Sequence, residues 1–134
     1  MNISSNKQTV ESSPKVIFDF ISDFNHFEAL LPTDKIENFK CTSDSCSFKI
    51  KGMADLALKI GEKESPSRIR VISEGGKPFP FHFDVNIAEL GETSSEVFID
   101  FEGDINQFMK MMVEKPLTNF FNMLVEKLAT LDLG

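Results

Sequence analysis

The chain has 134 residues, and at roughly 100–200 residues per domain this predicts one compact domain spanning residues 1–134. Its composition is 41% hydrophobic and 26% charged, which excludes a collagen-like, a disordered and a disulfide-rich chain. The formal net charge of −7 argues against binding to nucleic acid or to anionic membranes, because both attract basic surfaces.

The first residues predict one short strand and two short helices. Residues 3–11 alternate loosely between polar and apolar, which suits an edge strand. Ser13 is a good N-cap and Pro14 a good first helical residue, and apolar side chains then recur at helical spacing. A second short helix is predicted over 25–31, where Pro32 stops it.

From residue 34 the hydrophobic period changes to two, which is typical of strands. Short groups of Gly, Pro, Ser and Asp separate these segments and indicate consecutive antiparallel hairpins. Six strands are predicted, over residues 35–42, 45–51, 55–64, 68–74, 79–90 and 96–103.

Helical period returns at Asn106 and predicts one long amphipathic helix. Its apolar face comprises Phe108, Met109, Met112, Val113, Leu117, Phe120, Phe121, Leu124, Leu128 and Leu131. Pro116 lies inside this helix, where it lacks an N–H group and clashes with the preceding turn. We therefore expect a kink near residues 114–115.

A sheet with one apolar face and a long amphipathic helix bury their apolar surfaces most simply when the sheet curls around the helix. Phe81, Phe83 and Val85 form an apolar row on one face of their strand, which predicts that this face is inside. The row is expected to contact Phe120 and Leu124 of the long helix.

This element order resembles the START-like (SRPBCC) superfamily, and so does the string SPKVIFDFISDF at residues 13–24, followed by LLP at 30–32. The superfamily has the helix-grip fold of polyketide cyclases, lipid-transfer START domains, plant pathogenesis-related proteins and coenzyme-Q-binding proteins. The resemblance covers essentially the whole chain. It implies an α+β fold of order β-α-α-β-β-β-β-β-β-α, with a curved antiparallel sheet wrapped around the C-terminal helix. It also implies a cavity between sheet and helix for a lipid-, polyketide- or quinone-like molecule.

The cavity candidates are the side chains expected to face inward. If residues 43–44 are the turn of the first hairpin, Glu37 lies opposite Ile50 and shares the inward side with Phe39 and Cys41. Glu37 is then either a rim carboxylate that reaches water or a polar group that orients a ligand. The candidate ligand-binding residues are Glu37, Phe39, Cys41, Phe48, Leu58, Val71, Phe81, Phe83, Val85, Ile99, Phe101, Phe108, Met112, Phe120 and Leu124.

The two cysteines, Cys41 and Cys46, are predicted to lie directly opposite each other on adjacent strands. No stretch reaches the roughly 20 apolar residues of a membrane span, and the first residues lack the apolar core of a signal peptide. A cytoplasmic protein without an integral membrane segment is therefore expected. Its reducing surroundings would keep both cysteines as thiols, packed beside Phe39 and Phe48.

Neither a metal site nor a catalytic site is predicted. His26 and His82 are expected on different faces, and the cysteine spacing is not that of a zinc site, so no metal or cofactor is expected. No nucleophile–base arrangement is recognisable, and no catalytic residue is assigned.

The sequence therefore favours a binding protein whose partner is a hydrophobic small molecule and not nucleic acid. Two alternatives stay open. One is a cyclase- or dehydratase-type enzyme that uses the same cavity, and the other is a chaperone-associated interaction protein with a filled core. A weak homodimer also stays open.

Overall fold

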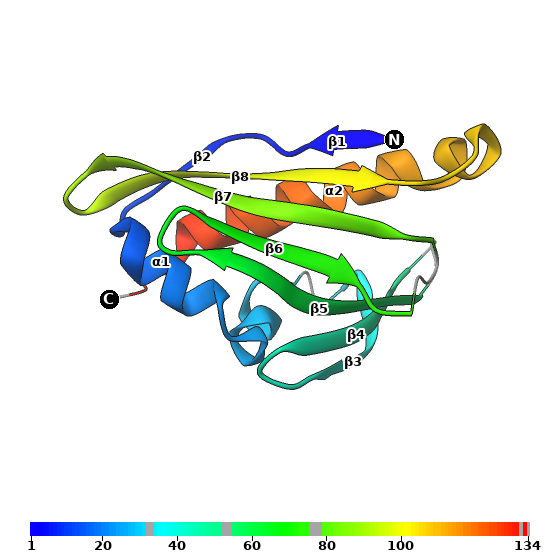
Figure 1. The fold of residues 1–134 in the computed structure, drawn as a ribbon, viewed down its shortest axis with the longest axis horizontal. Helices are drawn as coiled ribbons and strands as arrows, with labels where there is room; N and C mark the ends of the chain where they lie inside the picture. The colour runs from blue at the N-terminus through cyan, green and yellow to red at the C-terminus, as the bar shows by residue number, and fades with distance from the viewer. Residues whose placement is uncertain (32–33, 52–54, 76–78, 132, 134) are drawn as a thin grey trace.

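The computed structural model describes residues 1–31, 34–51, 55–75, 79–131 and 133, and Figure 1 shows how its elements are arranged. In chain order these are β1 (Asn2–Ser4), β2 (Gln8–Val10), α1 (Pro14–Ile21), the 3-10 helix η1 (Phe24–Ala29), β3 (Ile36–Cys41), β4 (Ser45–Ile50), β5 (Asp55–Glu64), β6 (Arg68–Ser73), β7 (Phe81–Gly91), β8 (Ser94–Gly103) and α2 (Gln107–Thr130).

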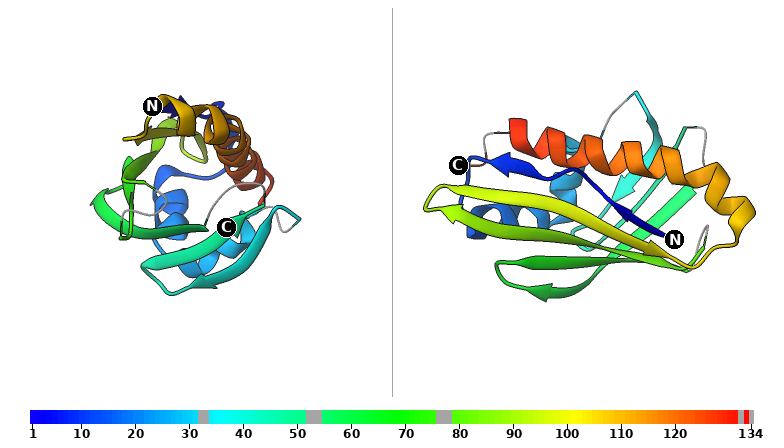
Figure 2. Two further views of the ribbon diagram at one scale, coloured as in Figure 1. Left: turned by 90° about the vertical axis from the view of Figure 1, so that its right-hand side faces the viewer. Right: turned by 90° about the horizontal axis from the view of Figure 1, so that it is seen from above.

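The strands of the described residues form one antiparallel sheet that curves around α2 (Figures 1 and 2). The order across the sheet is β1-β8-β7-β6-β5-β4-β3, and β2 also pairs with β8. Strands that follow each other from β3 to β8 are neighbours, which confirms the predicted hairpins. The backbone of α2 lies closest to β1, β2 and β8, so the helix sits toward one side of the sheet. The β3–β4 side of the sheet is less covered by α2.

The N-terminal edge strand differs from the prediction, because it is divided into β1 and β2. Between them, Ser5 is buried, and its backbone N–H donates to the carbonyl of Ile99 at 2.8 Å. The hydroxyl of Ser5 accepts a hydrogen bond from the backbone N–H of Ile99, also at 2.8 Å. A side chain thus replaces one backbone acceptor of the ladder, which interrupts the regular strand.

Both short helices have side-chain caps. The hydroxyl of Ser13 accepts from the backbone N–H of Val16 at 3.4 Å, with Pro14 in the first turn, as predicted. The second run is a 3-10 helix, capped by the Asp23 carboxylate on the N–H of Asn25 at 2.9 Å. Pro32, expected to stop this helix, lies outside the described residues.

The core lies between the concave face of the sheet and α2. Phe83 is 2% exposed, and its ring centroid lies 5.2 Å from that of Phe121. The sequence pointed to Phe120 and Leu124 for the contact with this row, and Leu124 does line the same small cavity as Phe83 and Val85. Phe120 lies instead 5.6 Å from the ring of Phe48 on β4, on the other side of the helix. Neighbouring positions of a helix diverge by about 100°, so the two phenylalanines reach opposite parts of the curved sheet.

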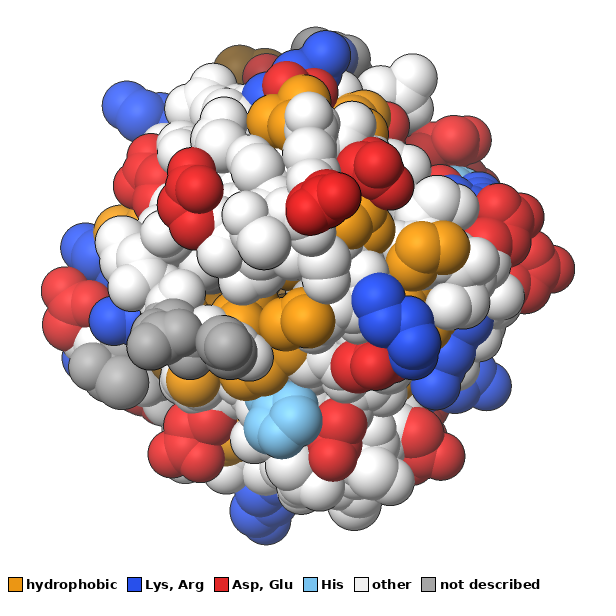
Figure 3. Space-filling view, turned by 90° about the vertical axis from the view of Figure 1, so that its left-hand side faces the viewer, with side chains coloured by type: hydrophobic (Ala, Val, Ile, Leu, Met, Phe, Trp, Pro, Cys, Tyr) orange, Lys and Arg blue, Asp and Glu red, His pale blue; other side chains and the backbone are white. Residues whose placement is uncertain are grey.

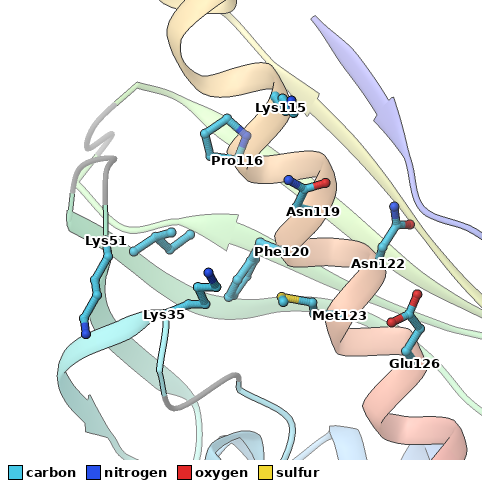
Figure 4. A pocket seen from close by; sticks show the side chains of 10 residues that line it. Lys35, Lys51, Lys115, Pro116, Asn119, Phe120, Asn122, Met123 and Glu126 are labelled. Atoms are coloured by element: carbon cyan, nitrogen blue, oxygen red, sulfur yellow. The ribbon is translucent and has the colours of Figure 1, made fainter.

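The long helix continues through Pro116, and its first turns are inclined to the remainder (Figures 2 and 4). Proline has no N–H, so the carbonyl of Met112 has no backbone donor one turn later. This agrees with the kink predicted from the sequence. The inclined turns project beyond the end of the sheet (Figure 1).

The outer surface carries charges of both signs. At the end of the molecule formed by α1 and the β7–β8 turn, Figure 3 shows acidic side chains around a small hydrophobic area, with basic side chains among them. Arg68 and Arg70, the only arginines of the chain, both pair with Asp84 on the outer face of the sheet.

Candidate functional site

The space between the sheet and α2 is almost completely filled by side chains. The small, partly open apolar cavity there measures about 20 Å³, which is room for about one water molecule. It is lined by Ile21, Phe27, Leu30, Phe83, Val85, Val97, Ile99, Leu124, Val125 and Leu128. The expected deep ligand cavity is therefore occupied by the core itself.

Most of the candidate residues do face inward, as the alternation predicted. Those that are at most 7% exposed are Phe48, Leu58, Val71, Phe81, Phe83, Val85, Ile99, Phe101, Phe120 and Leu124. Phe39 and Cys41 are half-buried against the same core. Burial places these side chains together, while their contact with a ligand stays a prediction.

Phe108 and Met112 do not face inward, and that part of the prediction is wrong. Their exposed fractions are 73% and 60%. Both lie in the first turns of α2, before the bend at Pro116, where the helix projects beyond the sheet (Figure 2). Helical spacing put them in line with the buried stripe, but none of the strands that the structure describes lies opposite to cover them.

Glu37 is exposed and lies opposite Lys49, so its predicted place beside the cavity is also wrong. The pairing shifts by one residue between Glu37 and Lys40, because β3 carries a bulge. Asn38 adopts a left-handed backbone there, with φ of 56°. A shift of one residue reverses the faces of a strand, and Ile36 takes the inward position instead.

Cys41 and Cys46 lie directly opposite each other, as predicted, with 4.1 Å between their Cα atoms. They form a disulfide in the structure, whereas the sequence interpretation expected two thiols. The opposed position on neighbouring strands brings both side chains to the same side of the hairpin, which is the geometric condition for the bond.

A groove of about 510 Å³ lies beside α2, on the side of the sheet that this helix covers less (Figure 4). One wall comes from the helix and the other from the start of β3 and the end of β4. The residues that line it are Lys35, Ile50, Lys51, Lys115, Pro116, Asn119, Phe120, Asn122, Met123 and Glu126.

The floor of this groove is apolar and its rim is polar. Ile50 and Phe120 are buried, and Met123 and Pro116 are half-buried beside them. A second hollow of about 660 Å³ shares Met123 and Glu126 with the groove and continues it along α2 toward η1. A volume of a few hundred Å³ above an apolar floor is typical of small-molecule sites, and six of the ten lining residues add polar or charged groups around it.

The sequence interpretation assigned Phe120 to the site but missed the lysines of the groove. Predicted hairpin pairing would set Lys35 opposite Gly52, which lies outside the described residues. With the bulge, Lys35 comes opposite Lys51 at the end of the ladder, and the backbone N–H of Lys51 donates to the Lys35 carbonyl at 2.9 Å. Nothing in the sequence pattern marks the bulge except an Asn, which tolerates the left-handed region.

Each of the two histidines contacts a neighbouring residue of the fold. The ring of His26 stacks on Phe20 at 4.7 Å, and its Nδ1 lies 2.8 Å from the Phe20 carbonyl oxygen. His82 lies on the outer face of the sheet, 3.9 Å from the Glu102 carboxylate. In the described ranges, no group of His, Cys, Asp and Glu could hold a metal ion, and no helix there is long and apolar enough to cross a bilayer.

Neither a family model nor a curated protein matches the sequence. Solved structures do match. The fold is similar to that of a START superfamily protein from Mycobacterium smegmatis, at 14% identity and a TM-score of 0.70, covering 96% of this chain and 94% of that one. It is also similar to a truncated norcoclaurine synthase from Thalictrum flavum, at 16% identity and a TM-score of 0.74, covering 96% and 91%. The chain thus has the START-like helix-grip fold.

Proposed function

We propose that this chain binds a hydrophobic or amphipathic small molecule in the groove between α2 and the β3–β4 hairpin. The observation that carries the proposal is the groove of about 510 Å³ with Phe120 and Met123 at its floor, next to an interior that holds only about 20 Å³. A ligand therefore lies along the side of the helix and not beneath it. Lipid-, polyketide- and quinone-like molecules all suit an apolar floor of this kind.

Desolvation of the ligand and of the floor supplies the binding free energy, at roughly 25 cal/mol per Å² of apolar surface buried. The amide of Asn119 on the rim offers hydrogen bonds that orient a polar group of the ligand. The amide oxygen of Asn122 instead accepts from the backbone N–H of Asn6 at 2.8 Å. Because the groove is open along one side, the ligand enters without unfolding of the sheet.

A matched pair of substitutions on α2 tests the proposal. Asn119 is exposed and lines the groove, so Asn119→Trp fills the groove without disturbing the core. Met111 is 76% exposed and does not line the groove, so Met111→Trp is the control. The neutral fluorescent probe N-phenyl-1-naphthylamine is expected to bind the unmodified chain and Met111→Trp, and to bind Asn119→Trp at least several-fold more weakly.

Equal binding to both variants, or no binding to the unmodified chain, would contradict the proposal. Extraction of the purified protein with organic solvent, followed by mass spectrometry, gives an independent readout through any co-purified ligand.

A ligand-free interaction protein is the second candidate, and the filled interior favours it. The exposed side chains of Phe108, Met111 and Met112 on the inclined first turns of α2 would then form part of the contact surface. Norcoclaurine synthase shows by its name that the same fold also serves enzymes, and fold alone does not separate binding from catalysis. A weak homodimer stays a prediction, which sedimentation velocity over a range of concentrations tests.

The cytoplasmic location expected from the sequence also stays a prediction. Disulfides persist mainly in oxidising compartments, so the pair Cys41–Cys46 bears directly on it. The thiol or disulfide state of these two cysteines in living cells tests the location.

A further inference from the structure

The charged groups around the groove are unevenly placed. Lys35 and Lys51 lie on its strand side and Lys115 on its helix side, whereas Glu126 lies farther along the helix (Figure 4). The second hollow beyond Glu126 adds the acidic residues Glu28 and Asp34 and one basic residue, Lys127. One end of the continuous groove is therefore rich in lysine, and at the other end carboxylates outnumber lysine.

Lys35 and Lys51 are neighbours at the open end of the β3–β4 ladder, joined by the 2.9 Å backbone hydrogen bond. Figure 4 shows the side chain of Lys35 directed toward α2 and that of Lys51 directed away from it. Together they make the strand side of the groove positively charged.

No acidic side chain of the described residues forms an ion pair with Lys35, Lys51 or Lys115. The same holds for most described lysines, since Lys7, Lys15 and Lys110 are those that form ion pairs. What distinguishes the groove is that three lysines and one carboxylate line it in a chain with 21 acidic and only 14 basic residues, and this local positive charge favours a negative group.

We propose that the groove binds an amphipathic organic monoanion, an inference that rests on the proposed function and specifies its ligand. The anionic head, a carboxylate or a group of similar charge, lies on the strand side of the groove beside the flexible side chain of Lys35, in the positive field of Lys51 and Lys115. The apolar body lies over Phe120 and Met123, which form the floor. Glu126 disfavours a second negative charge at the far end of the ligand, so a single anionic group fits better than a dianion.

Two competitors of equal chain length test this inference. The affinities of decanoate and 1-decanol are measured by their displacement of N-phenyl-1-naphthylamine from the unmodified chain. At neutral pH the two competitors differ essentially in the charge of the head group. Decanoate is expected to bind several-fold more tightly, since each exposed charge contact contributes a factor of roughly two to five. Added salt should reduce this difference by screening the lysines.

The double variant Lys35→Gln/Lys51→Gln should weaken the binding of decanoate about fivefold or more and leave the affinity for 1-decanol within about twofold of that of the unmodified chain. The control is Lys59→Gln/Lys63→Gln, which removes two exposed lysines of β5 that do not line the groove, and it should change neither competitor. Equal affinities for decanoate and 1-decanol, or equal effects of the two double variants, overturn the anion inference and leave the proposed function standing. Absence of binding by the probe and both competitors overturns both.

Discussion

Arg70 holds Asp84 through two parallel hydrogen bonds, from Nε to Oδ1 at 2.8 Å and from Nη2 to Oδ2 at 3.0 Å. The two residues are opposite each other on β6 and β7, on the outer face of the sheet. Arg68 adds a longer contact of 3.4 Å to the same carboxylate. This cluster ties the two central strands together on the side away from the core.

The Asp84 cluster predicts a pH-dependent contribution to stability. Partial burial alone would raise the pKa of Asp84, but the hydrogen bonds and positive charges of Arg70, with the charge of Arg68, outweigh it and hold the pKa below its usual value. A lowered pKa in the folded state gives stability that is present above the unfolded pKa of about 3.9 and is lost as the pH falls through the folded pKa.

Asp84→Asn is therefore expected to lower the free energy of unfolding by about 1–3 kcal/mol at neutral pH. The difference from the unmodified chain should shrink as the pH falls below about 4, measured by urea denaturation at several pH values. Glu92→Gln, in the exposed β7–β8 turn, is the control and should change stability little. A loss for Asp84→Asn that is the same at neutral and acidic pH would contradict the ionic origin of the effect.

Two phenylalanines with opposite exposure give a direct test of the core assignment. Phe83→Ala should cost about 3–5 kcal/mol, because the ring is 2% exposed and packs on Phe121. Phe108→Ala removes the same atoms from a side chain that is 73% exposed, and it should change the free energy of unfolding by no more than about 0.5 kcal/mol. Chemical denaturation of both variants measures the contrast. A cost below about 1 kcal/mol for Phe83→Ala would indicate that an open cavity lies beside it.

The sequence could predict the inner face of the sheet because alternation is a local property of a strand. Phe83 and Asp84 face opposite sides wherever the strand lies, so their burial followed from spacing alone. The helical stripe that contains Phe108 was less informative. Helical spacing shows which residues share a face, but it does not show how far the partner sheet extends along the helix.

The groove depends on two features that no periodic pattern carries. One is the bulge at Asn38, which moves Glu37 outward and pairs Lys35 with Lys51. The other is the position of α2 toward β1, β2 and β8, which leaves the opposite side of the helix open. Both depend on tertiary packing, so the residues of the site emerge only when the sheet is assembled.

The left-handed backbone of Asn38 gives a test of the bulge. Asn38→Gly should leave stability unchanged or raise it, because Gly adopts a φ of 56° without strain. Asn38→Val should lower stability by about 1–2 kcal/mol, since a β-branched residue is strained in that region. Thermal unfolding compares the two variants. Equal stability of the Gly and Val variants would indicate that β3 pairs without the bulge.

Gly103 is expected to be intolerant of a side chain. A Cβ atom there would lie 2.8 Å from Cε2 of Phe79 and 3.0 Å from Cε1 of Phe101. Both rings are buried, so Gly103→Ala should cost about 1–3 kcal/mol through overpacking. At Gly91 a Cβ would meet nothing within 4 Å, and Gly91→Ala serves as the matched control. Similar melting temperatures for the two variants would show that Phe79 does not pack on this glycine.

The disulfide between Cys41 and Cys46 predicts the labelling pattern of the purified protein. Protein prepared without reductant and alkylated in denaturant should carry no label, and after reduction it should carry label on both cysteines. The loop that the bond closes is short, with a sequence separation of 5, so opening it should cost about 2 kcal/mol or less. The double variant Cys41→Ser/Cys46→Ser should therefore still fold, with a modestly lower free energy of unfolding.

The same chemistry applied in cells tests the predicted cytoplasmic location. Acid quenching followed by alkylation preserves the thiol state that existed at lysis. In a reducing cytoplasm both cysteines should be labelled, because glutathione and thioredoxin keep thiols reduced there. Cys46 is 3% exposed, so labelling of the native reduced protein should begin at the more exposed Cys41. Full protection of both cysteines in quenched cells would contradict the cytoplasmic location and favour an oxidising compartment.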